Sequence, residues 1–496
     1  MDVMRLSSRL DIIIRDNLNR LPAEPFIWWQ KTWWSRGAFL ELIEECEERL
    51  RASNFKKGQR LALLMPNSPV LLATAVAVWR LGGAVVLIDF RSGYVPLIRQ
   101  LCHADVFAAL TYRGCEDLVP LISEEGIPCS VISLDTLDEN IPGRPCAEEG
   151  EETAVIFYTS GTTGEPKAVP LTHDNLLDCI EGCVEHIDML NEDDVFLNAL
   201  PNSNVFGFLC GALLPLVKAT RQAILTSFMP VESSMDAIKN AEVTIVTAVP
   251  TMIALMVGAV SRGAAVSSSM RCILSGGDRL PADISKRAAG LLGVPVLQGY
   301  GLTEASSVVA LPPSINAVKP GSVGTLLSCV EAEIRSDEGE VLPQGREGRL
   351  WIRGSSVAKC YFRNPELTAE RFADGWFDTC DIARFDEEGY LYLVGRACDV
   401  IFVGGFKVYA REVEKTLNEH PLVHEAAVIG VPRSISGEIV KAFVVLKKGE
   451  RASAKELIEY CKKKLSYYKV PRIIEFVTEM PRSAIGEIVK RKLSKD

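Results

Sequence analysis

Hydrophobic positions between residues 60 and 114 fall into short runs, separated by stretches long enough for helices. Short apolar runs bounded by turn residues favour buried strands, whereas longer apolar stretches favour helices. We predict strands at residues 60–65, 84–88 and 106–110, one helix at 68–81 and a second helix before the last strand. Strands that alternate with helices in this way form a parallel sheet covered by helices.

The same alternation returns between residues 153 and 302, where apolar strands are expected at 154–158, 243–248 and 271–274. From about residue 323 to residue 396 the pattern changes to short alternating strands interrupted by glycines. The pattern therefore predicts the α/β class, with a large N-terminal α/β domain that carries a β-rich subdomain.

The remaining part of the chain has a pattern of its own. It predicts a helix at 411–418, strands at 425–430 and 440–446, and a helix at 454–465, which together make a small α+β unit. A chain of 496 residues also exceeds what one hydrophobic core usually supports. We predict two domains, residues 1–396 and residues 397–496.

Composition and charge narrow the class of partner. The chain carries 64 acidic residues against 54 Lys and Arg, a net charge of -10, which argues against a nucleic-acid partner. The longest apolar run, residues 69–79, is well short of the roughly 20 residues that cross a bilayer. Residues 1–17 lack the apolar core of a signal peptide. The 14 cysteines include no CxxC pair, which is typical of reduced thiols. We predict a cytoplasmic protein with no membrane span.

A loop rich in glycine and hydroxyl groups, residues 158–167 (YTSGTTGEPK), follows the apolar strand at 154–158. Glycines let the backbone approach ligand oxygens closely, hydroxyls donate hydrogen bonds, and a lysine supplies positive charge. Such a loop can hold phosphates, although it is not a Walker A loop, because no Gly-Lys-Ser/Thr sequence follows. The candidate phosphate-binding residues are Thr159, Ser160, Gly161, Thr162, Thr163, Gly164 and Lys167.

This loop resembles the signature of the adenylate-forming superfamily, which contains acyl-CoA synthetases, nonribosomal adenylation domains and luciferases. Residues 298–304 (QGYGLTE) resemble the adenine motif of the same superfamily, and residues 275–278 (SGGD) resemble the turn before it. The resemblance implies that Tyr300 stacks on adenine, that Thr303 contacts phosphate and that Glu304 holds magnesium. It also places Gly276, Gly277, Gln298 and Gly299 at the nucleotide.

Two further segments extend the resemblance to the C-terminus. Residues 376–381 (WFDTCD) resemble the segment whose aspartate, here Asp381, binds the ribose hydroxyls, and Arg396 corresponds to the arginine after it. Cys380 stands where the superfamily normally has glycine, so we expect a slightly displaced backbone there. Residues 407–443 resemble the mobile C-terminal lid domain, which implies Cys398 as its hinge and Gly405 in the thiol tunnel.

The acid-binding pocket is also implied by resemblance. Its walls would include Asn204, Val249, Ser275 and Gly301. Asn204 stands where many members carry His or an aromatic residue, and its amide can still donate to a carboxylate. With Asn202 and Ser203 it is expected to make the pocket entrance more polar than in a typical fatty-acid enzyme.

One catalytic position departs from the superfamily pattern. The resemblance implies a catalytic set of Lys167, Thr303, Glu304 and a C-terminal lysine, but Glu487 occupies that lysine position. The lysine normally bridges the two anions that react, and one charge pair at about 4 Å contributes about 4 kcal/mol at an effective dielectric near 20. A charge reversal would therefore slow adenylation by several orders of magnitude. Three explanations stay open: Glu487 is protonated, Lys490 or Lys492 replaces the lysine, or adenylation is inactivated.

The implied function is an acid–thiol ligase. ATP and a small carboxylic acid give an acyl-adenylate, and CoA or the phosphopantetheine of an acyl carrier protein then takes the acyl group. The implied cofactors are ATP, Mg²⁺ and CoA or phosphopantetheine. Two alternatives remain: a protein that binds nucleotide or acyl-adenylate without turnover, and an amino-acid adenylation domain in which Asp278 would hold the amino group.

Overall fold

The structure is a computed structural model. It describes residues 9–92, 94–137, 141–147, 152–159, 167–187, 190–396, 400–403, 406–433, 437–465, 469–482 and 488–493. The chain divides into two compact units. The first contains Met1–Ala332, Ile352–Asp378 and Phe385–Tyr392, and the second contains Glu333–Trp351, Thr379–Arg384 and Leu393–Asp496. The domain boundary expected between residues 396 and 397 stays a prediction.

One large sheet of the first unit has six strands in the order β6-β5-β3-β4-β7-β8. The strands are β3 (Arg60–Leu64), β4 (Ala84–Leu87), β5 (Ala108–Tyr112), β6 (Cys129–Ile132), β7 (Thr153–Thr159) and β8 (Lys167–Thr172). All neighbours are parallel except β7 and β8, which are antiparallel. The predicted strands at 60–65, 84–88 and 106–110 are confirmed to within two residues, because each is a short buried apolar run.

Helices of this region follow the expected alternation. They are α3 (Pro69–Arg80), α4 (Tyr94–Ala104) and α5 (Leu118–Glu124). Ser68 caps α3 by accepting a hydrogen bond from the N–H of Leu71, and proline occupies the first turn. Residues 69–79, the longest apolar run, are all buried, so this run forms a core helix. No helix in the described ranges combines the length and the apolar character that crossing a bilayer requires.

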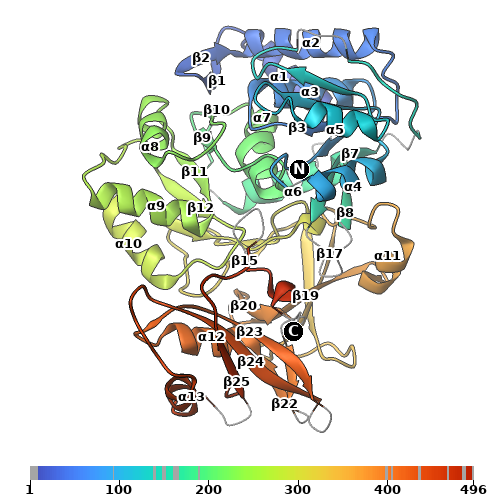
Figure 1. Ribbon diagram of the computed structural model, residues 1–496. Helices are drawn as coiled ribbons and strands as arrows, with labels where there is room; N and C mark the ends of the chain where they lie inside the picture. Colours follow the sequence, from blue (N-terminus) through green and yellow to red (C-terminus); the bar gives the residue numbers. More distant parts are fainter. Residues whose placement is uncertain are drawn as a thin grey trace. The chain divides into compact units, whose positions relative to one another are not determined.

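The second large sheet of the first unit has seven strands in the order β13-β12-β11-β9-β10-β1-β2. They are β1 (Pro25–Trp29), β2 (Thr32–Ser35), β9 (Val195–Asn198), β10 (Arg221–Ile224), β11 (Ile245–Ala248), β12 (Cys272–Ser275) and β13 (Val296–Gln298). The associated helices are α1 (Leu10–Arg20), α2 (Arg36–Ala52), α6 (His173–His186), α7 (Leu214–Lys218), α8 (Val231–Asn240), α9 (Pro250–Ser261) and α10 (Ala282–Leu292). Helices α8, α9 and α10 lie beside β11 and β12, with which they share one apolar core (Figure 1).

Short strands dominate between residues 310 and 396, as predicted. They are β14 (Ala310–Leu311), β15 (Thr325–Leu326), β16 (Val330–Arg335), β17 (Gly348–Gly354), β18 (Phe372–Ala373), β19 (Trp376–Phe385) and β20 (Leu391–Arg396). The described helix in this range is the short α11 (Pro365–Arg371). The single 3₁₀ turn η2 (Thr303–Ala305) lies just before the range. Strands β16, β17 and β19 each contribute residues to both units.

The second unit contains a five-stranded sheet in the order β22-β21-β24-β23, with β25 also paired to β24. Its strands are β21 (Val400–Val403), β22 (Phe406–Tyr409), β23 (Val423–Arg433), β24 (Gly437–Leu446) and β25 (Ile473–Phe476). Helices α12 (Ala410–Asn418) and α13 (Ala454–Lys462) pack with the sheet around one apolar core. This is the expected small α+β unit, so the predicted fold class is confirmed for both parts of the chain.

Candidate active site

The two glycine-containing turns meet at the carboxyl ends of neighbouring strands. Ser275 at the end of β12 is paired with Gln298 at the end of β13, and the N–H of Gly299 donates to the carbonyl of Ser275 at 2.8 Å. Residues 275–278 and 298–304 therefore lie side by side, as the resemblance implied. Ligands of open α/β sheets bind at this edge of the sheet.

Glycine is required in both turns because the backbone is approached closely. A Cβ atom on Gly301 would lie 1.4 Å from the carbonyl oxygen of Ser307, and one on Gly299 would lie 2.5 Å from Leu311 Cδ2. Gly277 has a φ of +81°, which residues with a side chain rarely adopt. The chain can thus pack tightly here and still leave its backbone close to a ligand.

The predicted phosphate loop connects two paired strands. Thr159 at the end of β7 is the register partner of Lys167 at the start of β8. The structure therefore brings together the two ends of the loop, and both residues are half-buried. Ser160, Gly161, Thr162, Thr163 and Gly164 lie outside the described residues.

Lys167 and Glu304, both predicted catalytic residues, meet at one tyrosine that sequence reasoning missed. The hydroxyl of Tyr361 donates to Glu304 Oε1 at 2.6 Å, and Lys167 Nζ lies 5.9 Å from the centre of the Tyr361 ring. The carbonyl of Glu304 also accepts from the N–H of Ala358 at 2.7 Å. A cation and a carboxylate are therefore held close together but not in contact. Thr303, also half-buried, begins the 3₁₀ turn that carries Glu304.

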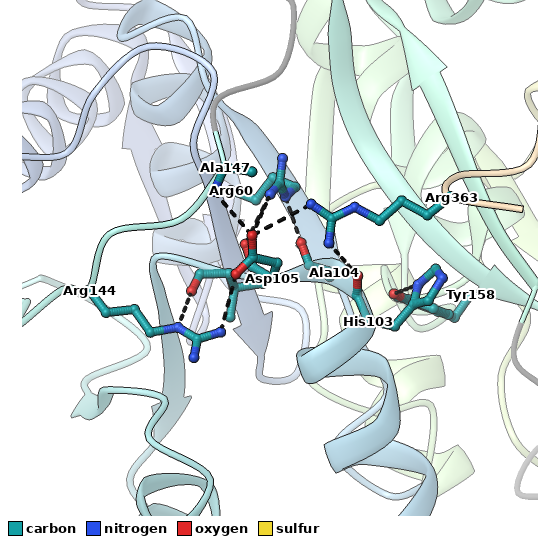
Figure 2. A network of polar contacts seen from close by, with 9 residues as sticks. Arg60, His103, Ala104, Asp105, Arg144, Ala147, Tyr158 and Arg363 are labelled. Atoms are coloured by element: carbon teal, nitrogen blue, oxygen red, sulfur yellow. Dashed lines mark hydrogen bonds and ion pairs between the residues drawn. The ribbon is translucent and has the colours of Figure 1, made fainter.

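The base of the phosphate loop is anchored to the end of α4. Tyr158 donates through its hydroxyl to the carbonyl of Gln100 at 2.9 Å. It also hydrogen-bonds His103 Nδ1 at 2.9 Å (Figure 2). Arg363 donates to the carbonyl of His103 at 3.1 Å. Because Arg363 follows the segment that contains Tyr361, these bonds tie the loop and that segment to the same helix end.

Asp105 lies at the centre of this network (Figure 2). Its carboxylate is 3.5 Å from guanidinium nitrogens of Arg60, Arg144 and Arg363, and it accepts from the N–H of Ala147 at 3.0 Å. Burial alone would raise the pKa of Asp105, but the Ala147 donor and the facing arginines together hold this pKa below its usual value. Arg60 and Arg363 also donate to carbonyls at the end of α4, as cations favourably do at a helix C-terminus.

Side chains from two other segments lie against the turn at residues 275–278. The ring of Phe206, a residue not predicted, would lie 3.1 Å from a Cβ on Gly276, and Val249 Cγ1 would lie 3.3 Å from one on Gly277. Ser275 is buried, and among the described residues its hydroxyl has no hydrogen-bond partner. Val249 and Ser275 therefore both lie at this turn, and their role as walls of an acid pocket stays a prediction. Gly301 lies on the neighbouring turn and is exposed.

The prediction of a polar entrance is only partly right. Asn204 is exposed, and its Oδ1 accepts from the N–H of Phe206 at 2.9 Å, so it shapes the loop that carries Phe206. Asn202 is 1% exposed, and its amide donates to Asn198 Oδ1 at 2.9 Å. We therefore correct the expectation for Asn202, which is buried because its polar atoms find partners inside the protein.

Asn202 belongs to a buried amide network below this loop. Asn67 donates to Asn198 Oδ1 at 3.0 Å and accepts from the N–H of Asn202 at 2.8 Å, and Asn198 donates to Gln222 at 3.2 Å. The loop then continues into a π-helix, Gly207–Leu213. Such helices are rare and are frequently found at functional sites. This network and the π-helix fix the position from which Phe206 projects.

Asp381 lies in the second unit. It is 7% exposed, and its N–H donates to Thr379 Oγ1 at 3.0 Å. Cys380 has a φ of +55°, so the backbone keeps the conformation that glycine adopts easily. The expected displacement of the backbone is therefore replaced by strain at a cysteine.

The other predicted residues of the second unit are less fully described. Arg396 ends β20, and Cys398, Gly405 and Glu487 lie outside the described residues. Lys490 forms an ion pair with Glu414 at 2.9 Å, and Lys492 is exposed. Of the two lysines that might have replaced the missing one, Lys490 is therefore already engaged within its own unit.

The residues present fit the nucleotide and the metal that the fold implies. Glu304 offers a carboxylate, the ligand that Mg²⁺ prefers, and one of its oxygens is oriented by Tyr361. The unpartnered hydroxyl of Ser275 and the exposed backbone of Gly277 and Gly301 can accept a base and a ribose phosphate at the strand ends. Tyr300 is half-buried in the same turn, where an aromatic face can stack on a base.

The fold and these residues define an adenylate-forming enzyme of the acid–thiol ligase class. Residues 14–362 match the AMP-binding enzyme family, and residues 412–487 match the AMP-binding enzyme C-terminal domain. The chain belongs to this family, and the predicted resemblance is confirmed.

Named relatives agree with this class. A feruloyl-CoA synthase of Amycolatopsis sp is 34% identical over 89% of each chain. A long-chain-fatty-acid–CoA ligase of Bacillus subtilis (strain 168) is 36% identical over 90% of this chain and 86% of its own. The ATP-bound MatB of Rhodopseudomonas palustris superimposes with a TM-score of 0.87 at 27% identity, covering 99% of both chains. The o-succinylbenzoate CoA synthetase of Bacillus subtilis, solved with an acyl-adenylate, gives 0.85 at 28% identity over 98% of both chains.

Proposed function

We propose that this chain joins a small carboxylic acid to CoA at the expense of ATP. The observation that carries the proposal is that Lys167 and Glu304 both lie at one residue, Tyr361, next to the paired turns at the ends of β12 and β13. A cation for phosphate oxygens and a carboxylate for Mg²⁺ are the two charges that a triphosphate site needs.

The first half-reaction is acyl-adenylate formation. A carboxylate oxygen attacks the α-phosphorus of ATP, a new P–O bond forms, and pyrophosphate leaves. Lys167 would neutralise charge on the phosphate oxygens, and Glu304 would hold the metal ion. Mg²⁺, when bound, supplies positive charge to the triphosphate. The apolar wall formed by Phe206 and Val249 would hold the body of the acid.

The second half-reaction is thioester formation. A thiolate attacks the acyl carbon, and AMP leaves with the electrons of the broken C–O bond. CoA is the acceptor we favour, because relatives that are at least 34% identical over nine-tenths of this chain are named CoA ligases or synthases. Their names cover aromatic and long-chain acids, so the acid is proposed only as a small or fatty carboxylic acid.

Glu487 is expected to slow the first half-reaction. We propose that adenylation by this chain is slow because a carboxylate occupies the position of the bridging lysine. Lys490 is bound to Glu414, which leaves the exposed Lys492 as the other candidate replacement. Thioester formation joins a thiolate to the acyl carbon and not to a phosphorus, so we expect Glu487 to affect this step less.

A protein that binds acyl-adenylate without forming it is the second candidate, and Glu487 is the observation that favours it. The third candidate, an amino-acid adenylation domain, has less support. Asp278 is exposed, and its Oδ1 already accepts from the N–H of Arg279 at 2.6 Å.

Mass spectrometry of thioesters tests the proposal. In one arm the protein receives ATP, Mg²⁺, CoA and a panel of short, medium, long and aromatic acids. In the second arm it receives synthetic acyl-adenylates and CoA, and in the third a carrier protein bearing phosphopantetheine replaces CoA. The proposal expects acyl-CoA in the second arm and slower acyl-CoA formation in the first. Absence of thioester in all arms would leave the binding function, and thioester only on the carrier protein would correct the acceptor.

A further inference from the structure

Tyr361 contacts both charged residues of the candidate active site, Lys167 and Glu304. Its hydroxyl binds Glu304 at 2.6 Å, and Lys167 Nζ lies over its ring at 5.9 Å. Within the described part of the chain, no ion pair joins Lys167 to Glu304. A direct ion pair would occupy the groups that a triphosphate and its metal require. Both charged groups therefore remain available to a ligand.

The position of Tyr361 is itself determined by packing and hydrogen bonds. Its residue surface is 3% exposed, and its ring packs edge-on against Phe372 at a centroid distance of 5.7 Å. Its N–H donates to Thr368 Oγ1 at 3.0 Å, and the N–H of the next residue donates to the carbonyl of Ala168 at 2.8 Å. Ala168 follows Lys167 in β8, so the tyrosine is tied to the strand that carries the lysine.

The segment around Tyr361 also holds the backbone of Glu304. The N–H of Ala358 donates to the carbonyl of Glu304 at 2.7 Å, and Ser306 donates through its hydroxyl to the carbonyl of Ser356 at 2.7 Å. Backbone and side chain of Glu304 are thus both held by residues 356–361. A carboxylate held in one rotamer loses less conformational entropy when it binds a metal ion.

We propose that Tyr361 is a positioning residue for Glu304. Its hydroxyl fixes one carboxylate oxygen and leaves Oε2 for a metal ion. The proposal rests on the proposed function, because it assigns Tyr361 to the binding of a metal–ATP complex. Hydrogen-bond partners of metal-binding carboxylates typically change metal affinity by about 10–100-fold when they are removed.

Tyr361→Phe is the variant that tests this role, since it removes only the hydroxyl and keeps the ring below Lys167. Tyr390→Phe is a matched control. Tyr390 is also buried, has Lys319 Nζ 4.1 Å above its ring, and donates through its hydroxyl to a backbone carbonyl, that of Ala317. Each protein is titrated with ATP in a calorimeter, once with Mg²⁺ and once with EDTA, and its melting temperature is recorded.

We expect Tyr361→Phe to weaken ATP binding about tenfold in Mg²⁺ and to leave binding in EDTA unchanged. Tyr390→Phe should leave both unchanged. In a Glu304→Ala background, Tyr361→Phe should have no further effect on ATP binding, because its partner is gone. That last comparison separates coupling through Glu304 from a general loss of packing.

Four results would overturn the inference. Equal affinity of the native protein and Tyr361→Phe in Mg²⁺ would show that the hydroxyl does not position the metal ligand. Equal losses in Mg²⁺ and in EDTA, or an undiminished effect in the Glu304→Ala background, would show a structural role only. Failure of the native protein to bind ATP under both conditions would refute the proposed function, and the inference with it.

Discussion

Gly301 is the position at which the geometry of the candidate site is least tolerant. A Cβ on this residue would lie 1.4 Å from the carbonyl oxygen of Ser307, 2.5 Å from its carbonyl carbon and 3.0 Å from Val308 Cα. All three atoms belong to the backbone, so a rotamer change cannot relieve the clash. Since ordinary contacts begin near 3.4 Å, the turn would have to move by roughly 2 Å in a closely packed region.

We expect Gly301→Ala to displace Tyr300 and Glu304, which lie in the same turn, and to weaken ATP binding at least 100-fold. A misplacement of about 1 Å can already cost about 100-fold in activity. The residue is exposed, so the loss of folding stability should be smaller than the loss of binding. Calorimetric titration with Mg²⁺ and ATP measures the first effect, and the melting temperature measures the second.

Gly290→Ala is the control for this prediction. Gly290 lies inside α10, and a Cβ there meets no atom within 4 Å. Because glycine is less favourable than alanine inside a helix by about 1 kcal/mol, this variant should be slightly more stable and should bind ATP normally. Gly301→Ala with native affinity for ATP would refute the assignment of residues 298–304 to the nucleotide.

Two further predictions concern stability. Cys380→Gly should stabilise the protein by about 1 kcal/mol, because Cys380 has a φ of +55°. Cys380→Ala keeps the strain and should give no gain. Chemical denaturation compares the two variants, and equal stabilities would contradict the reasoning. Burial, with a smaller contribution from Arg9, lowers the pKa of His173 to about 3. Below its ordinary pKa of about 6.5 the unfolded chain takes up a proton that the folded protein does not. Stability is therefore full above pH 6.5 and falls by up to about 1.4 kcal/mol per pH unit as pH drops toward 3. Urea midpoints between pH 7 and pH 5 should fall less steeply for His173→Gln, and parallel curves would show that His173 is not responsible.

Regular elements were predictable where the apolar pattern reports burial directly. The helix expected at residues 68–81 is α3 (Pro69–Arg80), since Ser68 and Pro69 are a cap and a first-turn proline. The split of the α/β body into two sheets was not predictable, because β1 joins β10, almost 200 residues away, through parallel pairing. Local periodicity carries no information on such partners.

The candidate site was also predictable only in part. Glycine-rich turns and Glu304 carry local signals, and the structure places them at neighbouring strand ends. Tyr361 carries no such signal, because its role depends on Glu304, 57 residues earlier in the chain. Asn202 was assigned to the pocket entrance because it stands beside Asn204 in a segment matched by resemblance, yet partners from β9 and from Asn67 make its burial favourable.

Acid-dependent release of pyrophosphate from ATP and Mg²⁺ tests the central claim most directly. It is measured on the native chain and on Glu487→Lys, with the same panel of acids. We predict that Glu487→Lys releases pyrophosphate at least 100-fold faster than the native chain does with the same acid. No acid-dependent release by either protein would contradict the assignment of this chain to acyl-adenylate formation.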